Sequence, residues 1–269
     1  MVVDGHVHIH ECFHVPEFLD AAAANLAAAA KRLGLSPAPA GCLLLVESQG
    51  VDQFARLADG TATTGAWRVS PTEEPVSLIA HRPRALPIVL VAGRQIVSRE
   101  RLEVLAIGTR ATFADGRPLD EALAGVMASD AVAVVPWGVG KWQGARGRLV
   151  ADLLERDHDR RLFVGDNGGR LGLAPRPKLF AKAHSRRVPV LPGSDPLPSP
   201  GQLAKVGGYG FVAEVDADAR APFAALRRYL EDLETSPRTF GRLESLPGFV
   251  RSQIAMQVQK HARPRAHGA

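Results

Sequence analysis

Short apolar runs alternate along this chain with stretches of helical periodicity. The apolar runs are rich in β-branched residues or leucine, and we predict strands from Val2 onward and over residues 41–46, 76–80, 88–92, 102–107, 131–135, 162–164, 188–191 and 210–215. Helical spacing predicts helices over residues 16–33, 51–58, 119–127, 146–156, 177–186, 219–233 and 248–261, with a helical turn over 199–205. Two stretches rich in turn-forming or polar residues are predicted to be a loop, 59–75, and a hairpin connection, 93–101.

Strands that alternate with helices usually pair in parallel through right-handed crossovers. About seven such units can be counted, and a single α/β barrel commonly needs about 250 residues. The chain has 269 residues. We therefore predict an α/β protein made of a single (β/α) barrel domain, residues 1–269. Its core is expected over 1–215, its C-terminal helices over 219–261 and a basic tail over 262–269.

Composition and charge narrow the class of protein. Hydrophobic residues make up 46% and charged residues 23%, which is typical of a globular protein. No apolar run approaches the roughly 18 residues that span a bilayer. The N-terminus does not resemble a signal peptide, and two cysteines do not make a disulfide framework. We expect a cytoplasmic protein with no membrane partner.

The net charge is +5, but the basic residues are spread along the chain rather than gathered in a stripe. Nucleic-acid binding normally needs a concentrated basic face, so this distribution disfavours it. A small anionic substrate is the partner that the charge favours.

The first predicted strand carries the sequence His6-Val7-His8. Residues two apart on a strand face the same side, so both imidazoles can point at one place. Neutral imidazole is a preferred ligand of zinc and related ions, and this spacing therefore predicts a metal site. An edge strand with solvated histidines is the alternative interpretation.

The active sites of β/α barrels lie at the carboxyl ends of the strands. Several polar residues directly follow predicted strands, and we treat them as candidates. The candidate metal ligands are His6, His8, Glu47 and Asp195, and the candidate catalytic residues are Lys141, Asp166 and Asp195. Lys141 could equally belong to a loop packed by two tryptophans, and Asp166 to a simple turn.

The two ends of this pattern resemble the PHP (polymerase and histidinol phosphatase-like) family. Residues 4–8, Asp-Gly-His-Val-His, are similar to its opening motif, and residues 188–195, Val-Pro-Val-Leu-Pro-Gly-Ser-Asp, to its closing strand. Weaker similarities at 45–52, 93–96 and 135–138 lie between them in order. The resemblance covers residues 1–215 and implies a distorted seven-stranded, TIM-like barrel with metal-dependent phosphoesterase activity.

Several family ligands are replaced here. The family holds two or three metals, but Ser48, Gln95, Pro136 and Leu197 stand at or near positions where it has histidine or an acid. The remaining ligands, with Glu47 as a stand-in acid, suffice for one zinc, manganese or iron ion. We expect the four replaced positions to line the same mouth.

Amidohydrolases also open with His-x-His and close with an aspartate, which can act as general base. Lys141 would be their bridging lysine if carbamylated. No histidine stands at the middle strand ends, where Trp137, Asp166 and Asn167 stand instead. This favours a mononuclear variant over a binuclear one.

Three functions follow from these patterns. The first is a metal-dependent hydrolase, phosphoesterase-like, that uses one metal-activated water on a small anionic substrate, with Lys141 and Arg94 adding positive charge. The second is a catalytically degraded PHP-like barrel that serves as a binding or scaffold protein. The third is a mononuclear amidohydrolase. The retained His-x-His and Gly-Ser-Asp favour an enzyme, and the missing ligands favour the second function.

Overall fold

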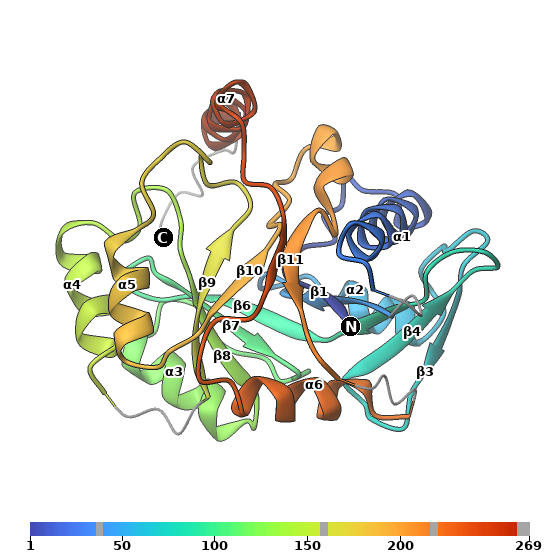
Figure 1. Ribbon diagram of the computed structural model, residues 1–269, viewed down its shortest axis with the longest axis horizontal. Coiled ribbons are helices and arrows are strands. Elements are labelled where there is room, and N and C mark those ends of the chain that lie inside the picture. The colour runs from blue at the N-terminus through green and yellow to red at the C-terminus, as the bar shows by residue number, and fades with distance from the viewer. Residues whose placement is uncertain (36–39, 157–160, 216–219, 263–269) are drawn as a thin grey trace, which may run out of the picture.

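The computed structural model describes residues 1–35, 40–156, 161–215 and 220–262 and contains two mixed β-sheets flanked by helices (Figure 1). The larger sheet has the order β12-β11-β1-β2-β5-β4-β3 and the smaller one β10-β9-β8-β7-β6. The strands of the larger sheet are β1 (Val2–Val7), β2 (Gly41–Leu45), β3 (Arg68–Pro71), β4 (Ser77–His81), β5 (Ile88–Val91), β11 (Tyr209–Val212) and β12 (Thr239–Gly241). Those of the smaller sheet are β6 (Gly93–Val97), β7 (Glu103–Ile107), β8 (Val132–Pro136), β9 (Leu162–Asn167) and β10 (Val190–Gly193).

The helices follow the predicted segments closely. They are α1 (Val15–Arg32), α2 (Gln53–Ala58), α3 (Leu119–Ala128), α4 (Gly144–Leu153), α5 (Lys178–Ser185), the 3-10 helix η1 (Pro200–Lys205), α6 (Pro222–Glu231) and α7 (Leu246–Ala262). The predicted start of a helix at residue 219 and the tail after residue 262 lie outside the described residues. None of the helices in the described ranges is long and apolar enough to cross a membrane.

The prediction of a single TIM-like, PHP-like barrel is wrong, because the structure has two open sheets of mixed strand direction. Only β1-β2-β5 and β8-β9-β10 pair in parallel. All other neighbours in both sheets are antiparallel. The molecule is an α/β fold with open sheets.

Connection length explains the difference. A parallel pair needs a crossover of a dozen or more residues, whereas an antiparallel pair can be joined by a tight turn. The links from β4 to β5 and from β6 to β7 contain no helix and are shorter than that, so each of these two pairs is antiparallel. Between β5 and β6 the chain passes from the larger sheet to the smaller one. Three short strands were also missed: β3 lies in the predicted loop 59–75, β6 lies in the predicted hairpin connection 93–101, and β12 follows α6.

Three apolar cores hold the layers together. Helices α1 and α2 pack on the outer face of the larger sheet, burying Phe18, Leu26 and Phe54. Helices α3, α4 and α5 cover the smaller sheet, with Val150 and Phe180 among their buried residues. A third core lies between the sheets. The central strands are therefore buried on both faces, which is why they are continuous apolar runs in the sequence.

Helix α6 covers one end of this central core (Figure 1). Its residues Phe223, Leu226 and Leu230 pack in the core that also holds Met1 and Val3, at the beginning of β1. The predicted site residues lie beyond the other end of β1. His6 and His8 thus lie at the carboxyl end of this strand, although the strand does not belong to a barrel.

Candidate metal centre

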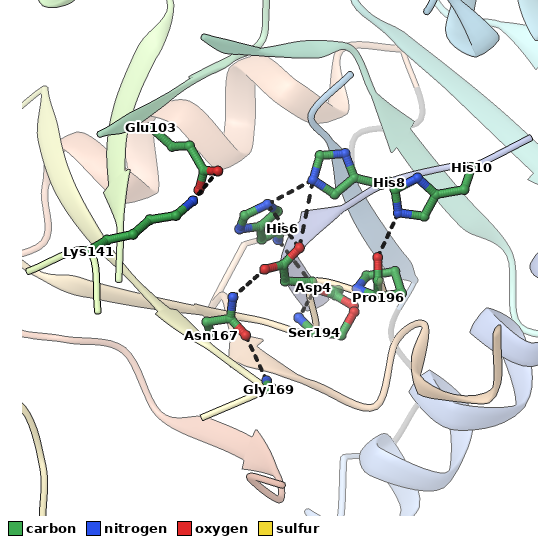
Figure 2. A network of polar contacts seen from close by, with 11 residues as sticks. Asp4, His6, His8, His10, Glu103, Lys141, Asn167, Gly169, Ser194 and Pro196 are labelled. Atoms are coloured by element: carbon green, nitrogen blue, oxygen red, sulfur yellow. Dashed lines mark hydrogen bonds and ion pairs between the residues drawn. The ribbon is translucent and has the colours of Figure 1, made fainter. Parts of the chain in front are cut away.

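Two histidines at the end of β1, His6 and His8 (Figure 2), meet Asp195 from a distant part of the chain. The Nε2 atoms of His6 and His8 lie 3.1 Å apart, and each lies close to Asp195 Oδ1, at 3.5 and 3.7 Å. All donor atoms of this group fall within 4.8 Å of one another. Both histidines are buried and Asp195 is largely so. The predicted convergence of these three residues is confirmed.

Two glycines allow the histidines to reach Asp195. Strands β1 and β10 belong to different sheets but cross so closely that the Asp195 N–H donates to the His6 carbonyl at 2.9 Å. A Cβ on Gly193 would lie 2.3 Å from the His6 nitrogen, and a Cβ on Gly5 would lie 2.6 Å from the Pro192 oxygen. The glycines of Asp-Gly-His and Gly-Ser-Asp are therefore needed for close approach of the two backbones.

Asp4 fixes this crossing from behind. Its carboxylate accepts N–H bonds from Ser194 at 2.8 Å, Gly207 at 2.9 Å and His6 at 3.3 Å. Burial raises the pKa of Asp4 to about 7, against the opposing effect of these donors. Asp4 is thus a positioning residue, a role that the sequence analysis did not assign to it.

The protonation states of His8 and Asp195 are the ones that can bind a metal cation. Burial, followed by the neighbouring His6, lowers the pKa of His8 to about 3, so its ring is neutral at physiological pH. Burial acts to raise the pKa of Asp195, but the two histidines, Lys141 and the Asn167 amide together hold it below its ordinary value. A neutral imidazole and an ionised carboxylate are the forms that bind metal.

The geometry also fits a single ion. Tetrahedral coordination with bonds of 2.0–2.2 Å places the ligand atoms roughly 3.3–3.6 Å from one another. The observed separations of 3.1, 3.5 and 3.7 Å surround that range. Three protein ligands leave a fourth position for water or substrate, as in catalytic zinc sites.

Neighbouring polar groups orient the ligands. The Asn167 amide donates to Asp195 Oδ2, and its own oxygen accepts the Gly169 N–H at 2.7 Å. The Gln95 side chain bonds His8, and the His10 ring stacks on His8 with centroids 5.1 Å apart. Such outer partners fix the orientation of metal ligands. Asn167 was noted in the sequence only as a residue beside Asp166.

Glu47 does not join the ligand group. Its carboxylate accepts the Phe54 N–H at 2.9 Å and pairs with Arg94 at 2.9 Å. Burial raises the pKa of Glu47 to about 7, opposed by these two partners. Glu47 lines the pocket beside His8, but its carboxylate links β2 to α2 and β6. The structure does not support the prediction that Glu47 is a metal ligand.

Asp166 is also turned away from the centre. It binds Arg170 through both oxygens, at 2.8 and 2.9 Å, and accepts the Tyr209 hydroxyl at 2.9 Å. Asp166 was chosen because it follows the predicted strand 162–164. In the structure β9 extends to Asn167, and strand alternation sends the side chains of Asp166 and Asn167 to opposite sides. The residue that reaches the centre is Asn167, so the predicted catalytic role of Asp166 is not supported.

Lys141 does reach the centre, but not as a free charge. Its ammonium group pairs with Glu103, and Figure 2 shows this pair on the side of His6 away from His10. It is close enough to help lower the pKa of Asp195. Glu103 was not singled out in the sequence, because it lies at the start of β7, and β7 runs antiparallel to β8.

The replaced positions fall around the same end of the sheets. Ser48 lines a pocket of about 700 Å³ together with His8, and Gln95 contacts the same histidine. Pro136 ends β8, and Leu197 follows Pro196, whose carbonyl contacts His10 at 2.8 Å. Two of the four thus lie directly at the centre, and the other two end or follow strands of the smaller sheet.

Comparison with known proteins adds a fold but no family. No protein-family model and no curated protein matches the chain. A solved structure, that of PsfC from Pseudomonas syringae PB-5123, is similar over 96% of this chain and 98% of its own, with a TM-score of 0.58 and 16% identity. At that identity the likeness shows a shared fold alone. The resemblance to the PHP family stays a prediction.

Proposed function

We propose that this protein binds one divalent metal ion at His6, His8 and Asp195 and hydrolyses a small substrate, with phosphate esters as the first candidates. The observation that supports this most directly is the convergence of two imidazole nitrogens and a carboxylate oxygen within 4.8 Å of one another. Zinc, manganese and iron are all compatible with two imidazoles and a carboxylate.

An ion held here would supply a water molecule of lowered pKa as the nucleophile. The side chains around it have separate tasks. Asn167 keeps Asp195 oriented towards the histidines. Lys141, held by Glu103, is the cation placed to bind an anionic oxygen of the substrate or to protonate its leaving group.

The site offers less positive charge for an anionic substrate than the sequence suggested. Arg94 is paired with Glu47 and Asp52, and Lys141 with Glu103. The chief uncompensated charge would be that of the ion itself, since +2 and the −1 of Asp195 sum to +1. This still favours an anion over a neutral substrate. Both cysteines are free, in keeping with the reducing cytoplasm that we propose as its compartment.

Metal content is the first test. The protein is purified without added metal, or is chelated and then given one equivalent of zinc, manganese or iron. After dialysis it should retain about one ion per chain, as measured by elemental mass spectrometry. His8→Ala and Asp195→Asn should retain none. Glu47→Gln is the matched control and should retain the ion, because Glu47 is not a ligand in this geometry.

Activity is the second test. A panel of phosphate esters and amides should reveal hydrolysis that chelation and both ligand substitutions abolish. Hydrolysis of amides alone would favour the amidohydrolase alternative, and bound metal with no hydrolysis would favour a binding protein. Activity unchanged by chelation and by both substitutions would exclude the mechanism.

A further inference from the structure

A second pocket lies directly behind the metal centre. It has a volume of about 660 Å³ and is bounded by the end of α1, the loop after β9, the start of β11 and residues 241–244. Gly168 and Ser194 line it, whereas their neighbours Asn167 and Asp195 belong to the centre. The wall between the two sites is one layer of backbone, and the pocket contains none of the three metal ligands.

The charge of this pocket is positive. Among its charged lining residues, Lys205 and Glu244 form an ion pair and cancel. The other two are Arg32 and Arg242, and neither guanidinium group has an ion pair or a hydrogen bond with any residue that the structure describes. Two guanidinium groups without partners at one cavity give it a net charge of +2.

The wall that carries these groups is firmly built. Glu244 donates its N–H to the Arg170 carbonyl at 2.9 Å and accepts the Gly172 N–H at 2.9 Å, so the segment after Arg242 is fixed to the loop after β9. On its other side, Gly241 pairs with Tyr209 in the sheet. The buried contacts of Asp166 with Arg170 and Tyr209 hold these two elements together.

We propose that this pocket is an anion site, in which Arg32 and Arg242 hold the phosphoryl or carboxylate group of a small molecule. Guanidinium groups bind such oxygens through paired N–H donors. A dianion would neutralise both arginines. The volume exceeds that of a phosphate ion and is within the range of small-molecule pockets, so an organic phosphate or carboxylate fits. The site is independent of the proposed hydrolysis, because it shares no ligand with the metal.

Inorganic phosphate is the probe, titrated into the full chain by calorimetry at constant ionic strength, which removes general screening. We expect saturable binding, weakened about tenfold or more by Arg32→Ala or by Arg242→Ala, since each substitution removes a charge-assisted contact. Both arginines are exposed, so the variants should fold, and their melting temperatures without phosphate verify this.

Two controls separate the site from its alternatives. Arg148→Ala removes an exposed arginine of α4 and should leave binding unchanged. His8→Ala and chelation should leave binding at this pocket unchanged, and a metal centre that also takes phosphate would appear as a second, separable site that both remove. Binding abolished by His8→Ala but unaffected by the pocket substitutions would place phosphate at the metal and overturn the proposal. Equal weakening by Arg148→Ala, or no saturable binding, would overturn it as well.

Discussion

At the scale of single residues, the geometry of the candidate centre depends on residues that are not themselves candidate metal ligands. Asp4 is the clearest case, because its buried carboxylate receives N–H bonds from Ser194 and Gly207 as well as from His6. It therefore joins β1, the loop after β10 and the start of β11 at one point. Removing a buried acceptor leaves its donors unsatisfied, which costs about 1–3 kcal/mol.

We expect Asp4→Asn to lower both stability and metal affinity. The amide nitrogen would face backbone donors, so the free energy of unfolding should fall by about 1–3 kcal/mol. Metal affinity should fall about 10–100-fold, as for other residues that support ligands. Urea unfolding and metal titration measure the two effects. An unchanged metal affinity in a destabilised protein would show that Asp4 only stabilises the fold.

Glu47 gives a prediction on pH. Its pKa is raised from 4.5 to about 7 by burial, so the folded state holds the proton more tightly than the unfolded chain. The stability from this group is present in full below about pH 4.5 and is lost as the pH rises through 7. The free energy of unfolding of the chelated protein should therefore decline as the pH rises from about 4.5 through 7. Glu47→Gln cannot titrate at this position, so the pH dependence should become shallower and keep the part due to Asp4, whose pKa burial also raises to about 7. An identical slope in this variant would contradict the prediction.

At the scale of elements, the crossing of β1 and β10 decides whether there is a site at all. The two strands are in different sheets, and their close contact depends on Gly5 and Gly193. The site is thus formed by two backbones that approach more closely than side chains would allow.

Gly193→Ala should separate the two strands. Its Cβ would lie 2.3 Å from the His6 nitrogen, so the backbone must move. We expect the free energy of unfolding to fall by about 1–3 kcal/mol and metal binding to be lost. Urea unfolding and metal analysis measure the two effects. Gly201→Ala is the control, because a Cβ there meets nothing within 4 Å. Equal behaviour of the two variants would show that the crossing is not tight.

At the scale of the whole molecule, helix α6 and the candidate centre lie at opposite ends of the central core. Helix α6 covers the end where β1 begins, and the histidines lie where β1 finishes. Substitutions at the α6 end should therefore change the stability of the fold without changing the geometry of the ligands.

Leu226→Ala tests this separation. Leu226 is fully buried in the core between the sheets, and truncation of such a leucine costs about 2–5 kcal/mol. We expect a lower unfolding free energy with metal affinity within about twofold of the parent protein. Leu149→Ala, at an exposed leucine of α4, is the control for stability. A parallel fall in metal affinity would show that the two ends are coupled.

The sequence determined the elements and the chemistry of the centre. The apolar runs and helical periodicities are local signals, and they located the helices and most strands within a few residues. His6 and His8 share a face because strand geometry requires it, and the Gly-Ser-Asp motif identified Asp195. The prediction that these residues meet at the end of a strand needed only the pattern and the resemblance.

Tertiary structure decided the rest. Strand direction and sheet order depend on contacts between residues far apart in the chain, and six of the ten strand pairs in the two sheets are antiparallel rather than parallel. The same contacts drew Glu47 to Arg94 and Asp166 to Arg170, because a buried carboxylate must find a partner. They also brought Asn167 to Asp195 and Glu103 to Lys141. Local sequence specifies which groups are present, but the packing of the two sheets decides which of them meet.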